Sequence, residues 1–406
     1  MIKKFKYFQD VSNLNSQVSW RERIHYLFCK SPYWKWNIFL FILICFLVSR
    51  MLMLAVQLFY QYDIGKAEPF LTSMQRWDAN WYHDIAKYGY ADPNISNSEG
   101  QVPWAFFPLF PMLIRAFYLL TDQDILIIGT IINSIAFISA LYMAFRYIIL
   151  TRENVYKAVL FVIFMTFGIY SFYFTALYTE AIFLFLLVSS LYHLKKRNYL
   201  ITGVFGALLS ATRNTGVLLI IAVIVQYISD YMKNSTEKSI KHFIKEVTSN
   251  EKFILCLAII PLGIFCYMFY LWNLTGDPLA FMRVQIVWGR SLHNPFYILL
   301  RSLCSIHPYE HIMAFISWIG IYFLWFLLKR KRGIECVLGT FFLFIPLSTS
   351  IASMQRYLIG SFVFVLAFID NLYELKGGKK KILILFVLCA YECILILRWF
   401  RNGHLY

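Results

Sequence analysis

The feature that most constrains this 406-residue chain is a series of long apolar runs. A helix needs about 20 apolar residues to cross the hydrocarbon core of a bilayer, and shorter alternating segments would indicate a β-barrel instead. The candidate spans lie at 36–60, 125–148, 156–174, 178–194, 199–212, 214–231, 253–273, 310–328, 334–350, 356–373 and 381–400. Only 15% of the residues are charged, whereas soluble domains carry about 25%. The sequence therefore predicts an all-α polytopic membrane protein.

Basic residues indicate which side of the membrane each loop takes, because short loops rich in Lys and Arg stay in the cytoplasm. The segment 1–35 is basic and is expected inside, whereas 61–103 is acidic and is expected outside. Further basic clusters lie at 146–157, 195–197, 233–252, 329–332 and 376–381. All of them share the cytoplasmic side only if the run 104–120, which two prolines interrupt, does not fully cross.

The sequence is compatible with two numbers of membrane crossings. If 104–120 does not cross, the chain has eleven spans, with its N-terminus inside and its C-terminus outside. If it does cross, another short run must not, and 199–212 is the first candidate, so we expect eleven or twelve spans. The predicted organisation is a cytoplasmic basic segment, 1–35, and one multi-span domain, 36–400, with outer loops at 61–104 and 274–309.

Several function classes are disfavoured by what the sequence lacks. The formal net charge of +16 follows from the positive-inside rule, and no soluble basic domain is evident that would bind nucleic acid. The eight cysteines form no CxxC pair and the histidines are scattered, so we expect no disulfide framework, metal site or cofactor. The sequence contains neither a P-loop nor a GxSxG motif, and the missing DxD motif argues against a metal-dependent sugar-nucleotide transferase. We also expect no cleavable signal peptide, because the first apolar run starts only near Trp36.

A polar and aromatic stretch, RWDANWYHDIAKYGY at 76–90, follows the first span. At about 100° per residue, 74–88 predicts an amphipathic helix at the membrane interface. Its apolar stripe holds Trp77, Trp81, Ile85 and Tyr88, and its polar stripe holds Arg76, Asn80, His83 and Lys87. Asp78 borders the apolar stripe, where partial loss of water makes a carboxylate more basic and suits it to general-base catalysis. The alternative is a plain interfacial helix whose Asp78 pairs with a nearby arginine.

Isolated charges recur at the predicted outer ends of later helices, namely Glu180, Arg213 and Arg356. An ionisable residue deep in a membrane costs about 2.5 kcal/mol or more and so indicates function, although a side chain that snorkels to the interface costs less. Arginine binds phosphate through paired charge-assisted hydrogen bonds, so these residues with Asp78 suit a lipid-linked phosphate. The loop 274–309 mixes aromatic and basic residues and forms either a sugar site or an interfacial loop. We expect the last three spans to be scaffold.

Four sequence blocks resemble the PIG-V family, which is the GPI mannosyltransferase 2 family with its bacterial relatives. The blocks are RWD at 76–78 with WY, IA and GY through Tyr90, FFPLFP at 106–111, YTE at 178–180 and ATRNTG at 211–216. RWD…GY followed closely by FFP is the most specific of them. The resemblance covers about residues 70–220, and the remainder matches only in helix pattern and length.

The resemblance implies a GT-C fold with an active site on the non-cytoplasmic face and a polyprenyl-phosphate sugar donor. By that implication Asp78 is the catalytic carboxylate of an inverting mannosyltransferase, and a lipid or glycan is the acceptor. Arg213, together with Arg356, would stabilise the leaving phosphate. The full set expected to bind substrate is Arg76, Trp77, Trp81, Tyr82, His83, Glu180, Arg213 and Arg356. Membrane lipids would surround the protein.

Two other function classes stay open at this point. A transporter or flippase for a lipid-linked or small polar solute would use the same arginines and glutamate for binding alone, although no internal repeat is evident. An acyl- or phosphoglycosyl-type membrane transferase would rely on a catalytic histidine, for which His83 is the candidate. Sidedness distinguishes these classes, because the glycosyltransferase reading requires residues near 95 to lie outside.

Overall fold

The computed structural model describes residues 20–65, 67–92, 95–96, 100–235 and 239–401. Most of the predicted basic segment 1–35 and several positions of the loop 61–104 therefore lie outside the described residues. Within the described part, all regular secondary structure is helical. Six stretches are long and apolar enough to cross a membrane: α3 (Trp34–Ile64), α7 (Ile125–Arg152), η5 with α11 (Asn214–Asn234), α13 with α14 (Glu251–Thr275), α17 (Pro308–Lys329) and α21 (Gly378–Phe400).

Shorter helices complete the bundle between these six. Four of them are apolar and 10–17 residues long: α6 (Leu109–Thr121), α8 (Val155–Phe167), α10 (Tyr199–Ser210) and α18 (Gly333–Leu347). Two more fill its interior, α9 (Glu180–Lys195) and α20 (Phe362–Glu374). These bounds match the predicted spans closely, and the predicted spans 156–174, 253–273 and 356–373 are each interrupted by a bend.

The connecting segments carry the remaining helical turns. They are α2 (Trp20–His25), η1 (Tyr26–Lys30), α4 (Phe70–Met74), α5 (Asp78–Tyr88), η3 (Pro103–Ala105), η4 (Ser171–Phe174), α12 (Ile240–Ser249), α15 (Ala280–Arg283), η6 (Val284–Ile286), α16 (Pro295–Leu303) and α19 (Met354–Ile359), while η5 (Asn214–Leu218) is the first part of the stretch that continues as α11. The outer loops predicted at 61–104 and 274–309 therefore contain ordered structure.

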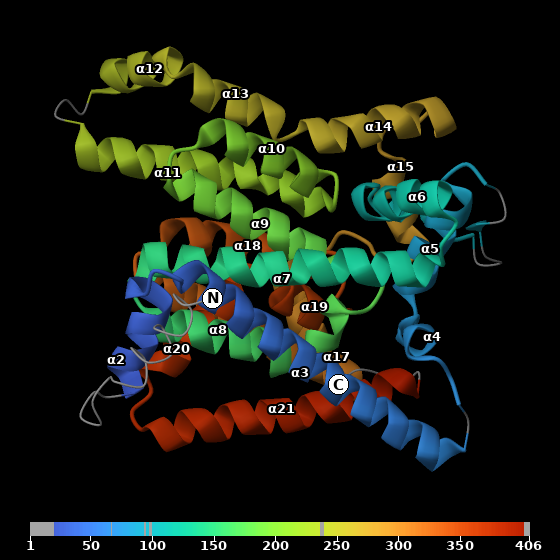
Figure 1. Ribbon diagram of the computed structural model, residues 1–406. Helices are drawn as coiled ribbons and strands as arrows, with labels where there is room; N and C mark the ends of the chain where they lie inside the picture. Colours follow the sequence, from blue (N-terminus) through green and yellow to red (C-terminus); the bar gives the residue numbers. More distant parts are fainter. Residues whose placement is uncertain (1–19, 66, 93–94, 97–99, 236–238, 402–406) are drawn as a thin grey trace.

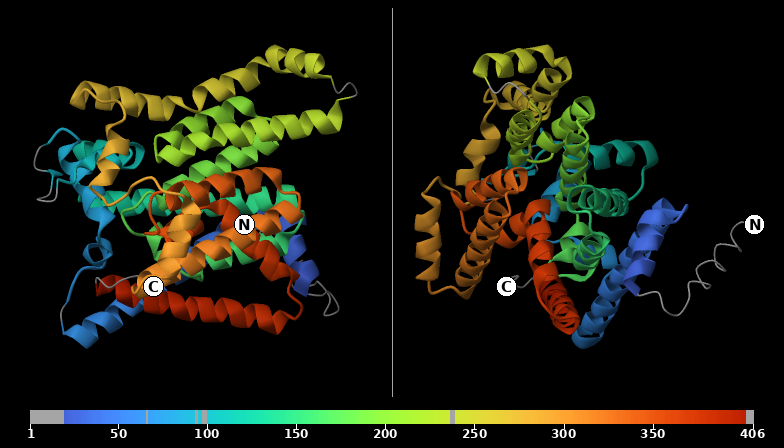
Figure 2. Two further views of the ribbon diagram at one scale, coloured as in Figure 1. Left: turned by 180° about the vertical axis from the view of Figure 1, so that it is seen from behind. Right: turned by 90° about the vertical axis from the view of Figure 1, so that its left-hand side faces the viewer.

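The long helices run side by side, so the bundle has two ends (Figures 1 and 2). We call the end with α4, α5 and α6 the site end, and the end with α2 and α12 the far end. The first span begins at the far end, where the Arg146 guanidinium lies 4.7 Å from the Trp34 ring. The last helix finishes at the site end, where Phe400 packs against Tyr60 near the end of α3. The first and last spans thus place the two ends of the described chain at opposite ends of the bundle.

Helix α6 lies entirely at the site end, beside α5 (Figure 1). The Leu109 amide donates to the carbonyl of Ala211, and the Arg115 guanidinium donates to the last carbonyls of α5. Since α3 ends and α7 begins at this same end, the chain passes through α6 without crossing to the far end of the bundle. This is the arrangement expected for the eleven-span alternative, and the number of crossings in a membrane stays a prediction.

Candidate functional site

The RWD block forms a strained turn between two short helices. Helix α4 ends at Met74 and α5 begins at Asp78, so the helix predicted for 74–88 starts four residues later than expected. Trp77, between them, has φ +48° and ψ −117°. A residue with a β-carbon is disfavoured at positive φ, and such strain persists only where the surroundings fix it. The turn presents Asp78 as the first residue of α5.

Two aromatic side chains from distant segments hold this turn in place. The Tyr178 hydroxyl donates to the carbonyl oxygen of Arg76 over 3.1 Å. The Trp399 indole N–H, from the end of α21, donates to the Ser73 carbonyl over 3.1 Å, and its ring meets Trp77 edge-on at 4.9 Å. Trp399 is fully buried. The last helix therefore fixes the conformation beside Asp78, although the sequence predicted only a scaffold there.

The buried face of α5 differs from the predicted apolar stripe. Ala79, Tyr82, Ile85 and Ala86 are buried, whereas Trp77 and Tyr88 are 43% and 45% exposed. The difference arises because α5 packs against α6 and α7 rather than only against a membrane surface. Burial raises the pKa of Tyr82 to about 12, so its hydroxyl stays protonated.

Four predicted site residues form one continuous chain of ion pairs. Asp78 Oδ2 lies 2.6 Å from Arg356 Nη1, and Arg356 Nε lies 3.0 Å from Glu180 Oε1. The same Glu180 oxygen lies 2.7 Å from Arg213 Nη2. Arg356 thus joins two carboxylates that are far apart in sequence. The Asp78 side chain is 29% exposed, and its carboxylate pairs with an arginine, as the alternative interpretation of this helix expected.

Glu180, at the centre of this chain of ion pairs, is buried, whereas the arginines on either side of it are partly exposed. Glu180 is 1% exposed, whereas the Arg213 and Arg356 side chains are each 16% exposed. The Arg356 guanidinium lies 4.4 Å from the centre of the Tyr178 ring, and the Arg213 guanidinium lies 5.2 Å from that of Phe183. Aromatic faces attract cations, so these rings orient both arginines while leaving part of each guanidinium accessible. Glu180 Oε2 has no hydrogen-bond partner among the described residues.

The ATRNTG block positions Arg213 through a tight turn. Helix α10 ends at Ser210, Arg213 is extended, and η5 starts at Asn214. A β-carbon at Gly216 would lie 2.3 Å from the Leu209 carbonyl oxygen, so only glycine fits this close approach. The turn directs the Arg213 guanidinium to the start of α9, where Nε donates to Thr179 Oγ1 over 2.9 Å.

Arg290 adds a cation that the predicted site residues did not include. Its Nη1 donates to the Tyr357 hydroxyl over 3.1 Å, and it lies close enough to interact electrostatically with Asp78 and Arg356. No described carboxylate forms an ion pair with it within 4.0 Å. With Arg213, Arg356 and Arg290 against Asp78 and Glu180, the formal charge is three minus two, or +1. The site is therefore biased towards an anionic ligand.

Two predicted substrate-binding residues point elsewhere. Arg76 Nη2 pairs with Glu68 over 2.9 Å, and the guanidinium also donates to the carbonyls of Thr72 and Gln75. His83 Nδ1 lies 2.9 Å from its neighbour Asp84. Among the described residues, neither side chain forms a hydrogen bond or an ion pair with a side chain of the ion-pair chain. The order of the sequence blocks does not predict these orientations, because residues adjacent in a motif need not face the same way.

Aromatic rings gather next to this chain of ion pairs. Trp81 stacks on Phe106 at 5.6 Å, and both rings meet Trp288 edge-on. The carbonyl of Phe106 accepts hydrogen bonds from the hydroxyls of Tyr90 and Tyr267, which fixes the FFPLFP block. The Trp288 indole nitrogen is buried without a partner among the described residues. This group joins α5 to the loop that carries Arg290.

Sequence reasoning also missed charges inside the last helices. Glu392 of α21 is buried and accepts from the amides of Tyr170 and Phe172 and from the Ser171 hydroxyl. These bonds fix η4, the turn that precedes the YTE block. The signal available was a carboxylate within an otherwise apolar run, which is costly in a membrane. Among the described residues, no group of three or more His, Cys, Asp or Glu side chains is arranged to hold a metal ion.

Comparison with known proteins supports the fold. No family model and no curated protein sequence matches this chain. The crystal structure of ArnT from Cupriavidus metallidurans bound to undecaprenyl phosphate is similar, with a TM-score of 0.51 and 11% identity over 84% of this chain. The archaeal oligosaccharyltransferase AglB from Archaeoglobus fulgidus, in complex with an inhibitory peptide and a dolichol-phosphate, gives a TM-score of 0.47 and 11% identity, covering 92% of this chain and 56% of that one.

At this level of identity the similarity concerns the fold alone. The chain spans 63% of the length of the ArnT chain that it matches. The helical bundle, the apolar spans and the match to ArnT agree with one another and with the fold that the sequence blocks implied. This chain is a multi-span membrane protein with the fold of the GT-C glycosyltransferases.

Proposed function

We propose that this protein is a polyprenyl-phosphate-dependent glycosyltransferase with Asp78 as its general base. The observation that carries the proposal is the chain of ion pairs Asp78–Arg356–Glu180–Arg213, with Arg290 beside it, which binds Tyr357 and no described carboxylate. It offers one accessible carboxylate next to a surplus of positive charge, which is what transfer from a phosphate-linked sugar requires. ArnT, which shares the fold, was crystallised with undecaprenyl phosphate.

The proposed reaction is a single displacement at the anomeric carbon of the donor sugar. The acceptor hydroxyl oxygen forms the new bond to this carbon while its proton passes to the Asp78 carboxylate. The bond from the anomeric carbon to the phosphate oxygen breaks, and polyprenyl phosphate leaves with the electron pair. Arg213 stabilises the charge that grows on the phosphate, and Arg290 attracts the phosphate of the donor before the reaction. One displacement without a second carboxylate nucleophile gives inversion of configuration.

Arg356 has a positioning role in this scheme. It holds Asp78 through Nη1 and Glu180 through Nε, so the orientation of the base depends on a buried anchor. Glu180 keeps its charge because two arginines compensate it, and its burial keeps it from competing with Asp78 as a base. The aromatic group around Trp81 and Trp288 borders the site and would exclude water from the reacting centre.

The narrower proposals follow the sequence blocks. The RWD, FFP, YTE and ATRNTG blocks suggest a PIG-V-type enzyme, and therefore mannose as the sugar and a lipid or glycan as the acceptor. The same reading places the site end on the non-cytoplasmic side. The basic residues at the junctions α7–α8, α17–α18 and α20–α21 support this placement because they gather at the far end, as the contacts of Arg152 and Arg330 with α20 illustrate.

A transfer assay with matched variants tests the reaction. Purified protein in liposomes would receive polyprenyl-phosphate mannose carrying a radiolabelled sugar, with membrane lipids and glycans as acceptors. We expect Asp78→Asn to lower transfer about 10²–10⁴-fold, the usual contribution of a general base. Asp84→Asn is the control, because Asp84 lies on the same helix and pairs with His83 outside the ion-pair chain. Equal transfer by wild type and Asp78→Asn would remove Asp78 from the mechanism.

Labelling of a native cysteine tests the sidedness. Cys304 is exposed at the end of α16, within the predicted outer loop 274–309. A membrane-impermeant maleimide applied to intact cells should label the wild type at this position and leave Cys304→Ser unlabelled there. Labelling of Cys304 only after the cells are opened would place the site end in the cytoplasm.

A further inference from the structure

Helix α21 contacts the site end through two side chains that lie two helical turns apart. Glu392 and Trp399 are separated by seven positions, which places them on the same face of a helix. This face is the buried face of α21 and also carries Leu395 and Ile396. Trp399 holds the turn before Asp78, whereas Glu392 binds the turn η4. The last helix is therefore joined to the site end by a carboxylate as well as by an aromatic ring.

Three hydrogen-bond donors converge on the buried Glu392 carboxylate. Its Oε2 accepts from the Tyr170 amide over 2.5 Å, and its Oε1 accepts from the Ser171 hydroxyl over 2.8 Å and the Phe172 amide over 3.0 Å. Arg50 of α3 interacts with it electrostatically. A backbone N–H can only donate, so both carboxylate oxygens must act as acceptors. A glutamine at this position would have to place its NH2 group against one of the two amides.

The backbone that Glu392 binds is strained and needs this support. Tyr170 has φ +64°, in the left-handed region that is costly for a residue with a β-carbon. Such a conformation persists only where its surroundings fix it, and here the carboxylate binds the amide of that same residue. At the other end of η4, Phe174 stacks on Phe137 of α7 at 4.5 Å. Glu392 and Phe137 therefore hold η4 from its two ends.

The turn η4 leads to two aromatic rings that face the central arginine of the ion-pair chain. Tyr173 belongs to η4 and Tyr178 follows it, and their ring centres lie 5.6 Å apart. The Arg356 guanidinium lies 5.5 Å from the centre of the Tyr173 ring and 4.4 Å from that of Tyr178. Its Nη1 then binds Asp78 over 2.6 Å. The position of η4 thus determines where both rings lie, and the rings orient the arginine that holds Asp78.

We propose that Glu392 is a positioning residue of the active site, which acts on Asp78 through η4, the rings of Tyr173 and Tyr178, and Arg356. The proposal rests on the proposed function, in which Asp78 is the general base. Glu392 does not touch the substrate in this role, and it determines how accurately Arg356 presents Asp78. A displacement of a reacting group by about 1 Å lowers a rate about 10²-fold, so a small movement of η4 is sufficient to affect transfer.

Kinetics of the full chain in liposomes test this role against a matched control. Glu392→Gln should lower kcat about 10–10²-fold and leave the donor KM within about threefold, because Arg213 and Arg290, which act on the phosphate, stay in place. Glu335→Gln is the control, because Glu335 is also a buried carboxylate that accepts from a tyrosine hydroxyl and pairs with an arginine, but at the far end. It should lower the unfolding midpoint without changing kcat of the folded protein. Equal losses of kcat in both variants would overturn the proposal.

A double-mutant cycle with Arg356→Lys tests whether Glu392 acts through that arginine. If it does, the two losses of kcat overlap, so the double variant is less impaired than the product of the single losses. The same cycle with Glu335→Gln should give independent effects. Losses that simply multiply for Glu392→Gln and Arg356→Lys would overturn the proposed route. Ser171→Ala is a milder second variant if Glu392→Gln does not fold, because it removes one of the three donors, and it should lower kcat in the same direction.

Amide hydrogen exchange separates this proposal from the proposed function, because it requires no sugar transfer. Glu392→Gln in nanodiscs should raise exchange about tenfold in segments 76–80 and 354–359, which carry Asp78 and Arg356, whereas Glu335→Gln should leave both segments unchanged. If exchange rises there but the wild type transfers no sugar from any polyprenyl-phosphate donor, the positioning network stands and the glycosyltransferase proposal fails. If transfer depends on Asp78 while Glu392→Gln changes neither kcat nor this exchange, the positioning role fails and the enzyme assignment stands.

Discussion

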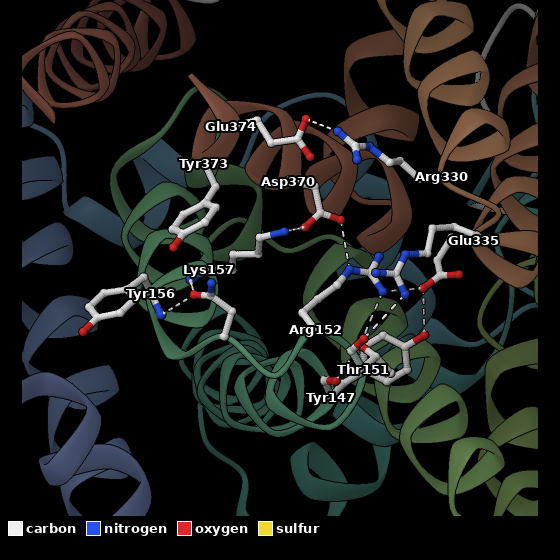
Figure 3. Close-up of polar contacts among 12 residues, drawn as sticks. Tyr147, Thr151, Arg152, Tyr156, Lys157, Arg330, Glu335, Asp370, Tyr373 and Glu374 are labelled. Atoms are coloured by element: carbon white, nitrogen blue, oxygen red, sulfur yellow. Dashed lines mark hydrogen bonds and ion pairs between the residues drawn. The ribbon is translucent and has the colours of Figure 1, made fainter. Parts of the chain in front are cut away.

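Two networks of four charged residues lie at opposite ends of this bundle, and both contain two basic and two acidic side chains. At the site end, Asp78, Arg356, Glu180 and Arg213 alternate in sign. At the far end, a second network contains Lys157, Asp370, Arg152 and Glu335 (Figure 3). Each network has two cations and two anions, and each joins helices that are far apart in sequence.

The networks differ in how completely they are closed. At the far end, the side chains of Arg152, Glu335 and Asp370 are 1%, 4% and 7% exposed. The Tyr147 hydroxyl adds a hydrogen bond to Glu335, and Lys157 caps Asp370 over 2.7 Å. At the site end, Asp78 and both arginines keep exposed surface, and Arg290 adds a charge that no described carboxylate balances. A closed and neutral network fastens helix ends, whereas an open network with surplus charge can receive a ligand.

The largest expected effect comes from breaking the far-end network. Asp370→Asn removes the anion that Arg152 and Lys157 share and leaves Arg152 paired with Glu335 alone. Breaking a buried ion pair by removing one partner costs about 3–5 kcal/mol. We expect a clear fall in the thermal unfolding midpoint of the detergent-solubilised protein. The comparison variant is Asp78→Asn, which removes a carboxylate that is 29% exposed and should lower the midpoint much less. Equal losses of stability would mean that both networks are structural fasteners.

The next effect concerns catalysis, where we expect the site end to be sensitive to substitution and the far end to be insensitive. Arg213→Gln should lower kcat/KM about 10²–10³-fold, because it removes a donor to the leaving phosphate. Arg152→Gln should leave kcat/KM of the correctly folded protein within about twofold, because Arg152 touches only the far-end network. Active-site titration with a tightly bound donor analogue would correct both values for unfolded protein. A comparable loss in both variants would contradict the assignment of Arg213.

A smaller effect is expected from the surplus charge at the site end. Arg290→Gln should raise KM for the donor about tenfold with little change in kcat, because it reduces attraction for the phosphate and leaves Asp78 and Arg213 in place. Raising the salt concentration should increase KM for the wild type more than for the variant. Arg290→Lys should restore part of the lost affinity. A fall in kcat with unchanged KM would instead place Arg290 in the chemical step.

The smallest expected effect lies at an exposed pair close to the far-end network. Arg330 pairs with Glu374, and both side chains are largely exposed. Such pairs contribute about 0–1 kcal/mol, so Arg330→Gln should shift the unfolding midpoint only slightly and leave transfer unchanged. A large loss of stability would show that the far-end network extends to this pair and is less closed than the burial of Arg152 indicates.

The helical bundle and the four residues of the ion-pair chain could be selected from the sequence because both selections rest on local rules. Apolar length identifies a span, and the long helices end close to the predicted bounds. Charges at helix ends are costly in a membrane, which marked Glu180, Arg213 and Arg356, and the structure brings all three together with Asp78. Arg290 was not selected because the loop 274–309 contains several arginines that look alike in sequence.

What the sequence by itself determined is the class of protein, the position of its spans and the residue types available at the site end. The tertiary structure decided which of those residues meet. Arg356 pairs with Asp78 across 278 positions, Trp399 holds the turn before Asp78, and His83 faces its neighbour instead. The physical reason is that apolar length and local charge act within one helix, whereas an ion pair or a pocket depends on how several helices from distant segments pack together.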